Sequence, residues 1–201
     1  ETQKSLIRQF NVIEKQKILA QKQLTKLDQL IKFRFVEMFG KTRDFDNAPI
    51  EAVCDLIVDC PHETPKYEGQ LMYPAIRTSE IGHGHILWNT MKYVSQTEYE
   101  RRTKRALPQS EDIVYAREGS YGNAIMLPPG QAFCLGQRTM LFRPNKTLVH
   151  PAYLLWAILS DDFKKQADAL NVGSTVPHVN VRDAKKFFIP LPPFSLQQEF
   201  A

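Results

Sequence analysis

A long helical segment at the start of the chain constrains the fold more than any other feature. Residues 4–38 contain neither Gly nor Pro, and apolar side chains recur at alternating steps of four and three. Eight of the ten seam positions are apolar, the pattern of a helix that packs along another helix over five heptads. At ~1.5 Å per residue the helix extends ~50 Å, so we expect a spacer or dimerisation rod that ends at Gly40. The apolar seam positions are Leu6, Phe10, Ile13, Ala20, Leu24, Leu27, Ile31 and Met38.

The two ends of the chain carry related hexapeptides. Residues 5–10 and 195–200 share Ser, Leu and Phe at three of six positions in the same register. The first copy opens the long helix, and the second follows the Pro-rich segment 190–193. Helix, domain and the start of the next helix would form one period of a tandem repeat. We therefore expect a spacer helix at 1–40, a domain at 41–190 and the start of the next helix at 191–201.

Composition and cysteine usage exclude several classes of protein. Hydrophobic residues make up 43% of the chain and charged residues 24%, which is ordinary for a globular domain. No run of 18 apolar residues occurs, so no membrane span is expected. Cys54, Cys60 and Cys134 form no disulfide framework, which favours a reducing, cytoplasmic location. With His62, the first two cysteines lack a fourth zinc ligand, so we expect packed thiols and no metal site.

Charge is unevenly distributed along the chain. Residues 1–43 carry ten Lys and Arg against four Asp and Glu, whereas residues 66–146 carry eleven against seven. A basic region on a domain of low net charge is compatible with a polyanionic partner, and equally with a solvated surface of mixed charge.

Short apolar runs separated by turns follow residue 45 and predict an α+β chain whose mixed α/β domain has a β-meander core. Residues 50–58 fit either a short helix or a strand. Ser95 with Glu98 predicts a capped helix, and Pro151 predicts the first residue of a helix that continues to about residue 170. The predicted strands cover residues 73–76, 86–88, 112–116, 124–127, 133–135, 139–142 and 187–189.

Catalytic motifs are missing from the sequence. It contains no Gly-x-Gly-x-x-Gly, no P-loop and no His-Glu-x-x-His, and Gly119-Ser120 lacks the rest of a nucleophile elbow. We therefore expect a protein that is not an enzyme and binds no cofactor of its own.

Hydrogen-bonding side chains gather instead in the predicted turns. Arg and Gln or Asn read guanine and adenine edges bidentately, while Ser, Thr and Tyr commonly hold phosphates. A helix that repeats with a domain at fixed spacing also suits the reading of DNA. The candidate DNA-binding residues are Arg77, Thr78, Ser79, Arg117, Ser120, Tyr121, Gln137, Arg138, Ser174, Thr175, His178 and Asn180.

These motifs resemble the specificity subunit of type I restriction-modification systems over essentially the whole chain. The segments that carry the resemblance are residues 73–81, 112–114, 117–120, 136–138, 173–180 and 189–193, with Gln197-Gln198-Glu199. The resemblance implies one target recognition domain, which reads half of a bipartite double-stranded DNA target, and a spacer helix that sets the gap between the halves. It also implies binding to methyltransferase subunits, a link to the motor-nuclease subunit, and self-association through the helix. S-adenosylmethionine, ATP and Mg²⁺ would belong to those partner subunits.

Two other readings stay open at this point. The same domain could be the recognition half of a single-chain restriction or methylation enzyme. Alternatively, the chain could be a coiled-coil interaction protein without a role at DNA, in which case changing Arg77, Arg117, Gln137 and Arg138 together would have no effect.

Overall fold

The computed structural model describes residues 2–40, 45–69, 72–171 and 178–201. The chain forms two compact units, residues 1–41 and residues 42–201. The first unit is a single helix and the second is a mixed α/β domain. The predicted α+β class, a long N-terminal helix followed by a mixed domain, is therefore confirmed.

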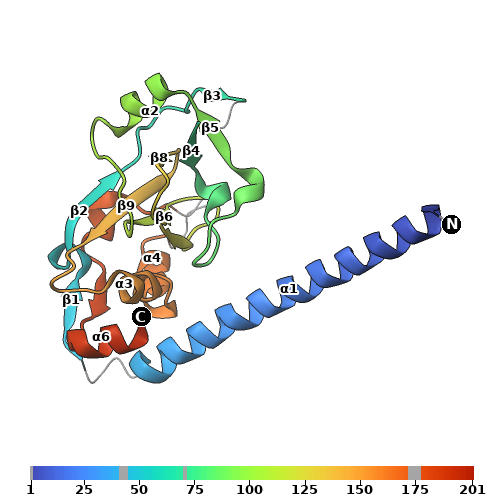
Figure 1. Ribbon diagram of the computed structural model, residues 1–201. Coiled ribbons are helices and arrows are strands. Elements are labelled where there is room, and N and C mark those ends of the chain that lie inside the picture. Colours follow the sequence, from blue (N-terminus) through green and yellow to red (C-terminus); the bar gives the residue numbers. More distant parts are fainter. Residues whose placement is uncertain (1, 41–44, 70–71, 172–177) are drawn as a thin grey trace. The chain divides into compact units, whose positions relative to one another are not determined.

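The first unit is one continuous helix, α1 (Thr2–Phe39), as the segment without Gly or Pro predicts (Figure 1). It ends at Phe39, as expected. The amide of Gly40 still makes the helical bond to the carbonyl of Val36 at 2.8 Å, and a side chain at position 40 would collide with that carbonyl. Along the seam, the large side chains from Leu6 to Ile31 are 40–66% exposed. An apolar stripe of this length is typical of a helix that packs against a partner.

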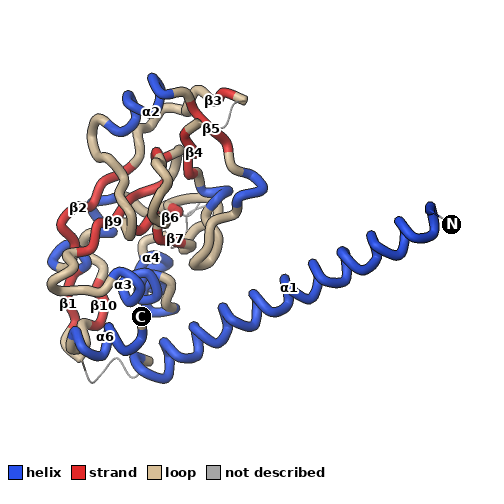
Figure 2. Tube along the Cα trace, in the orientation of Figure 1, coloured by secondary structure: helices blue, strands red, loops and turns tan. Residues whose placement is uncertain are grey.

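The domain is built on a four-stranded antiparallel sheet, the central sheet, with strand order β2-β9-β6-β7 (Figure 2). β6 and β7 form the hairpin that the sequence predicts at residues 112–127. Residues 50–58, for which helix and strand both remained open, contain one of each: a 3-10 turn, η2 (Ile50–Ala52), followed by β2. The strands are β2 (Cys54–Asp59), β6 (Ile113–Ala116), β7 (Ala124–Met126) and β9 (Thr139–Pro144).

A second sheet has the order β3-β5-β4-β8 and includes one parallel pair, β4 with β8. The prediction that residues 133–135 continue the meander is wrong: the chain crosses to the second sheet as β8 and returns to the central sheet as β9. The pairing of β8 with a strand some 60 residues earlier leaves no local signal. The strands are β3 (Tyr67–Glu68), β4 (Tyr73–Ile76), β5 (Lys92–Val94) and β8 (Cys134–Leu135).

The core lies on both faces of the central sheet, because side chains alternate along β6. Val114 and Ala116 pack into a cluster that includes Ile76 and Leu135 of the second sheet. Between them, Tyr115 makes an edge contact with Phe163 of α4 (Asp161–Ala169), with ring centroids 6.1 Å apart. The central sheet therefore has the second sheet packed on one face and helix α4 packed on the other.

The predicted helix caps are confirmed, but one predicted helix is divided. Ser95 accepts the amide of Glu98 and starts α2 (Gln96–Thr103), and Pro151 is the first residue of α3 (Pro151–Ile158). The helix expected to reach residue 170 breaks at Ser160, whose hydroxyl donates to the carbonyl of Ala157 and accepts the amide of Phe163. This local competition with the backbone ends α3 and caps α4.

The predicted strand at residues 86–88 is wrong. The segment forms a single bridge, between Ile81 and Ile86, and then the 3-10 turn η4 (Trp88–Thr90). The amide of Leu87 donates to the carbonyl of Glu80, so the chain closes on itself and does not extend into a sheet.

The two ends of the domain are joined by a two-stranded sheet, in which β1 (Asn47–Pro49) pairs with β10 (Phe188–Pro190). β10 confirms the predicted last strand, shifted by one residue. The last helix, α6 (Phe194–Phe200), packs on α3. Its Gln197 is buried, donates to the carbonyls of Leu148 and Pro192, and accepts the amide of His150. The second copy of the terminal hexapeptide is therefore helical, like the first.

Candidate nucleic-acid interface

The predicted turns converge where the chain passes between the two sheets. Residues 77–79 follow β4, residues 117–121 follow β6, residues 136–138 join β8 to β9, and residues 178–180 precede α5 (Val181–Ala184). We call these four segments the turn cluster. The backbone bonds that join them are Gly136 amide to Ile76 carbonyl at 2.6 Å, Arg117 amide to Arg138 carbonyl at 2.9 Å, and Val179 amide to Arg117 carbonyl at 3.3 Å.

Arg77 is bound by internal partners at the N-terminus of the 3-10 turn η3 (Thr78–Glu80). Its guanidinium pairs with the fully buried Glu80 through two nitrogens and donates to the carbonyl of Thr90 at 3.0 Å. The hydrogen bond from Arg77 to Glu80 holds the pKa of the guanidinium above its usual range. The ring of Tyr67 lies 5.5 Å from the guanidinium carbon. These contacts leave Arg77 little freedom to reach a ligand.

Arg117 is buried and joins three parts of the domain. Its Nε donates to the carbonyl of Val179 at 2.8 Å, and one terminal nitrogen lies 3.4 Å from Asp59 at the end of β2. The other terminal nitrogen lies 3.0 Å from Nε2 of His178. A guanidinium only donates, so Nε2 of His178 must accept and the ring proton lies on Nδ1.

Glu118 continues this polar chain toward solvent. One carboxylate oxygen lies 2.8 Å from Nδ1 of His178 and accepts the hydrogen bond that this N–H donates. The other lies 3.1 Å from Nε of Arg138. A continuous series of polar contacts therefore runs through Asp59, Arg117, His178, Glu118 and Arg138. In each contact a nitrogen donor faces an acceptor.

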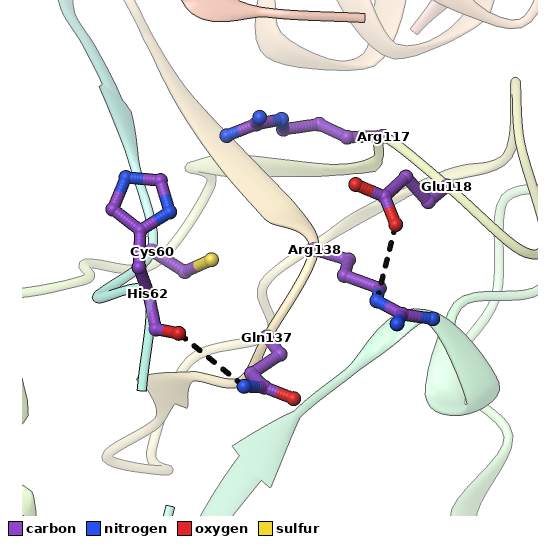
Figure 3. A pocket seen from close by; sticks show the side chains of 6 residues that line it. All are labelled: Cys60, His62, Arg117, Glu118, Gln137 and Arg138. Atoms are coloured by element: carbon purple, nitrogen blue, oxygen red, sulfur yellow. Dashed lines mark hydrogen bonds and ion pairs between the residues drawn. The ribbon is translucent and has the colours of Figure 1, made fainter. Parts of the chain in front are cut away.

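A pocket of about 300 Å³ opens beside this series. Figure 3 shows Cys60 and His62 on one side and Glu118 with Arg138 on the opposite side. Gln137 lies between them and donates to the carbonyl of His62 at 3.4 Å. The lining is almost entirely polar, and the side chains of His62 and Arg138 are exposed. Such a surface can present donors and acceptors to a polar ligand.

Some predicted residues lie elsewhere or act within their own turns. Tyr121 faces α4 and accepts a hydrogen bond from Asn171 at 3.2 Å. Asn180 caps α5 by accepting the amide of Asp183. The hydroxyl of Ser120 donates to the carbonyl of Thr78, while Ser79 is exposed and bonds the carboxylate of Glu80. The predicted residues Ser174 and Thr175 lie outside the described residues.

The sequence did not single out the acidic partners of this cluster. Asp59, Glu80 and Glu118 each hold an arginine, and their carboxylates are mostly or fully buried. The spacing of Arg77 and Glu80, three residues apart, is a signal that could have been read. Nothing local indicates that Asp59 would meet Arg117, because Asp59 ends β2, Arg117 follows β6, and these two strands are not neighbours in the sheet.

A buried arginine of α2 was also missed. Arg102 donates to the carbonyls of Leu135, Glu63 and Pro61, which lie in the segments that lead to Gln137 and His62. Its side chain has no exposed surface, so it links the two sides of the pocket from behind.

Within the described residues, no group of three or more His, Cys, Asp or Glu is arranged to hold a metal ion. The cysteines are free thiols, and burial raises the pKa of Cys54 and that of Cys134 to about 12. Such thiols remain protonated at neutral pH and pack as apolar groups. No described helix is long and apolar enough to cross a membrane.

Comparison with known proteins identifies the family. The family model of the type I restriction modification DNA specificity domain matches residues 53–201. The chain belongs to this family, which confirms the resemblance drawn from its motifs.

A curated relative is the type I restriction enzyme MjaVIII specificity subunit of Methanocaldococcus jannaschii, 24% identical over 131 residues, 63% of this chain and 31% of that protein. The HsdS subunit from Thermoanaerobacter tengcongensis has a similar fold, with a TM-score of 0.57 at 20% identity over 77% of this chain and 40% of that one. The type I S subunit from M. genitalium gives 0.60 at 11% identity over 89% and 46%. The chain thus spans less than half the length of each of these relatives.

Proposed function

We propose that the domain of residues 41–190 reads one half of a bipartite DNA target as part of a type I restriction-modification complex. The observation that carries this proposal is the convergence of the turn cluster. Segments from four places in the sequence bring polar and basic side chains to one surface, where the two sheets meet. Loops held by a rigid scaffold are a common platform for recognition.

The internal arginines support the same reading. Arg77 and Arg117 fix the turns from inside, and Arg138, Gln137 and His62 form the outer surface. With this division, the exposed side chains that would contact DNA can be changed while the buried arginines that support the turns are kept. The domain itself carries no catalytic role in the proposal.

We infer that α1 serves as spacer and docking element. Besides the seam, the helix exposes a second set of apolar side chains, among them Ile18, Phe33 and Val36. At 100° per residue these lie roughly opposite the seam, so α1 can contact two partners at once. One face suits another spacer helix or a second copy of this chain, and the other suits a methyltransferase subunit.

The proposal places the remaining chemistry on other chains. Methyltransferase subunits would bind S-adenosylmethionine, and the motor-nuclease subunit would use ATP and Mg²⁺. The chain would act in the cytoplasm, where the DNA lies, and phosphate contacts would make its binding dependent on salt.

The test is genome-wide mapping of methylated bases in cells that make the full subunit together with its methyltransferase. Residues 45–190 are exchanged for another recognition domain of the family, and α1 is kept. We expect one half of the split motif to change while the gap keeps its length.

A matched strain exchanges α1 for a spacer helix of a different length and keeps residues 45–190. It should change the gap and leave both half-motifs intact. If the domain exchange leaves the motif as it was, residues 45–190 do not read DNA. The coiled-coil interaction protein, which the exposed seam of α1 also fits, would then be the better reading.

A further inference from the structure

We propose that Arg138 reads the guanine of a G·C pair in the half-site, and that Glu118 is the positioning residue that aims it. This inference rests on the proposed function and assigns a base to a side chain within it.

Internal contacts separate Arg138 from the other two arginines of the turn cluster. The side chains of Arg77 and Arg117 are only 22% and 8% exposed, and several bonds to the domain engage each of them. That of Arg138 is 63% exposed and has one partner, Glu118. Arg138 is therefore the arginine of the cluster that is placed to meet a ligand.

The free edge of Arg138 matches guanine. Its Nε faces Glu118 at 3.1 Å, and Figure 3 shows the two terminal nitrogens beyond that contact. No hydrogen bond joins either terminal nitrogen to another residue in the part of the chain that the structure describes. Two parallel N–H groups on a planar fork fit the O6 and N7 acceptors of guanine in the major groove.

The backbone presents this side chain in a fixed direction. Arg138 lies in the left-handed region with φ 64°, and its carbonyl accepts the amide of Arg117. Gly136, two residues earlier, packs so closely on Arg77 and Ile76 that no side chain fits there. The turn is therefore rigid before any ligand arrives, which lowers the entropic cost of binding.

Glu118 holds the guanidinium through a chain of contacts that reaches the core. Its second oxygen is bound to His178, which is bound to Arg117, which is bound to Asp59 and to the carbonyl of Val179. Glu118 cannot turn away from Arg138 without losing the bond to His178.

The same carboxylate argues against a phosphate as the partner of Arg138. An anion brought to the terminal nitrogens would approach a negative charge that already neutralises the guanidinium. A base edge is neutral, so it meets donors without that repulsion. The geometry thus favours base reading over backbone contact.

The experiment maps methylated bases in cells that make the full subunit with its methyltransferase. The variants are Arg138→Ala, Arg138→Lys and Glu118→Gln. The control is Lys146→Ala, an exposed lysine beyond the opposite end of β9. Lysine keeps the charge but not the fork, and each replacement at position 138 carries a Cβ, so the left-handed backbone is strained equally.

We expect Arg138→Ala and Arg138→Lys to make one G·C position of the motif degenerate while the other positions persist. Discrimination at that position should fall roughly 5- to 150-fold, the equivalent of the ~1–3 kcal/mol of a good bidentate pair. Glu118→Gln should relax the same position by a smaller factor, and Lys146→Ala should leave the motif unchanged.

Three results would overturn the inference. The motif could stay intact in Arg138→Ala, Arg138→Lys could behave like the parent, or a folded and assembled variant could lose methylation at all sites equally. In each case the exchange of residues 45–190 still decides separately whether the domain reads DNA. Folding and assembly are checked by co-purification with the methyltransferase.

Discussion

Arg117 and Arg138 line the same pocket and carry the same charge, but they differ in what surrounds them. Arg117 is 8% exposed and satisfies a carbonyl, a carboxylate and an imidazole from three segments. Arg138 contacts a single carboxylate and otherwise faces solvent. A buried group with several partners contributes to stability, whereas an exposed pair contributes little.

This difference predicts that the same substitution has a large effect on stability at position 117 and a small one at position 138. Arg117→Ala should lower the free energy of unfolding by ~2–4 kcal/mol, because it leaves the carbonyl of Val179 and the carboxylate of Asp59 with fewer partners. Arg138→Ala should change it by less than ~0.5 kcal/mol. Urea denaturation of the two variants and the parent chain measures both. Equal losses would show that the pocket has no internal frame distinct from its outer surface.

At the scale of single residues, the sequence indicates which turns carry polar side chains but not which of those side chains face inward. The turn motifs predict Arg77, Arg117, Gln137 and Arg138 as readers of DNA, and backbone hydrogen bonds bring together the turns that carry them. It also buries Arg117 and engages Arg77 with Glu80. Whether an arginine faces inward depends on an acidic partner that is distant in sequence, and a turn motif carries no information about that partner.

Among the elements, α2 supports the pocket through its buried charged side chains. Arg102 ties it to the segments before Gln137 and around His62, while Glu98 ties it to the start of β3. Glu98 is buried, accepts two hydrogen bonds from Arg101 at 2.9 Å, and accepts the amide of Lys66 at 3.3 Å. The hydrogen bonds from Arg101 lower the pKa of Glu98 below its usual value of 4.5.

A pH dependence of stability follows from this lowered pKa. The folded state favours the ionised carboxylate, so its contribution is fully present above about pH 4.5 and is lost as pH falls through the lower folded pKa. Glu98→Gln should therefore lower the free energy of unfolding by ~1–3 kcal/mol at pH 7, and the gap to the parent should close in acid.

Denaturation of both chains between pH 7 and pH 3 measures this gap. The control is Glu100→Gln on the same helix, because Glu100 is exposed and accepts a hydrogen bond from the neutral side chain of Gln96. Glu100→Gln should change stability little at any of these pH values. A gap for Glu98→Gln that stays constant across the range would contradict the role of the charged form.

Elements with strong local signals were predicted well. The helix α1, the strand β4, the β6–β7 hairpin and the caps at Ser95 and Pro151 all follow from periodicity, turn residues and capping. The failures come from competition and from long-range pairing. Ser160 divides a helix that apolar spacing alone would continue, and β8 leaves the meander for β4.

For the molecule as a whole, the apolar surface of α1 is the feature that demands a partner. Leu24 and Leu27 of the seam are 56% and 53% exposed, and Ile18 and Phe33 on the opposite side are 54% and 68% exposed. Positions 18 and 33 lie fifteen residues, or about four turns, apart and so share a face. Two exposed apolar faces on one rod favour a helix that is enclosed between two partners in the assembled complex.

Paired substitutions should separate the two faces. Leu24→Glu with Leu27→Glu should abolish helix pairing, because two charges at a and d positions cannot be buried in a coiled-coil seam. Ile18→Glu with Phe33→Glu should leave pairing intact and weaken binding of the methyltransferase subunit. Sedimentation of the chain alone measures the first effect, and co-purification with the methyltransferase measures the second. Because all four residues are similarly exposed, neither double variant should unfold the domain. If both double variants lose both interactions, α1 has one continuous binding surface and the assignment of separate faces is wrong.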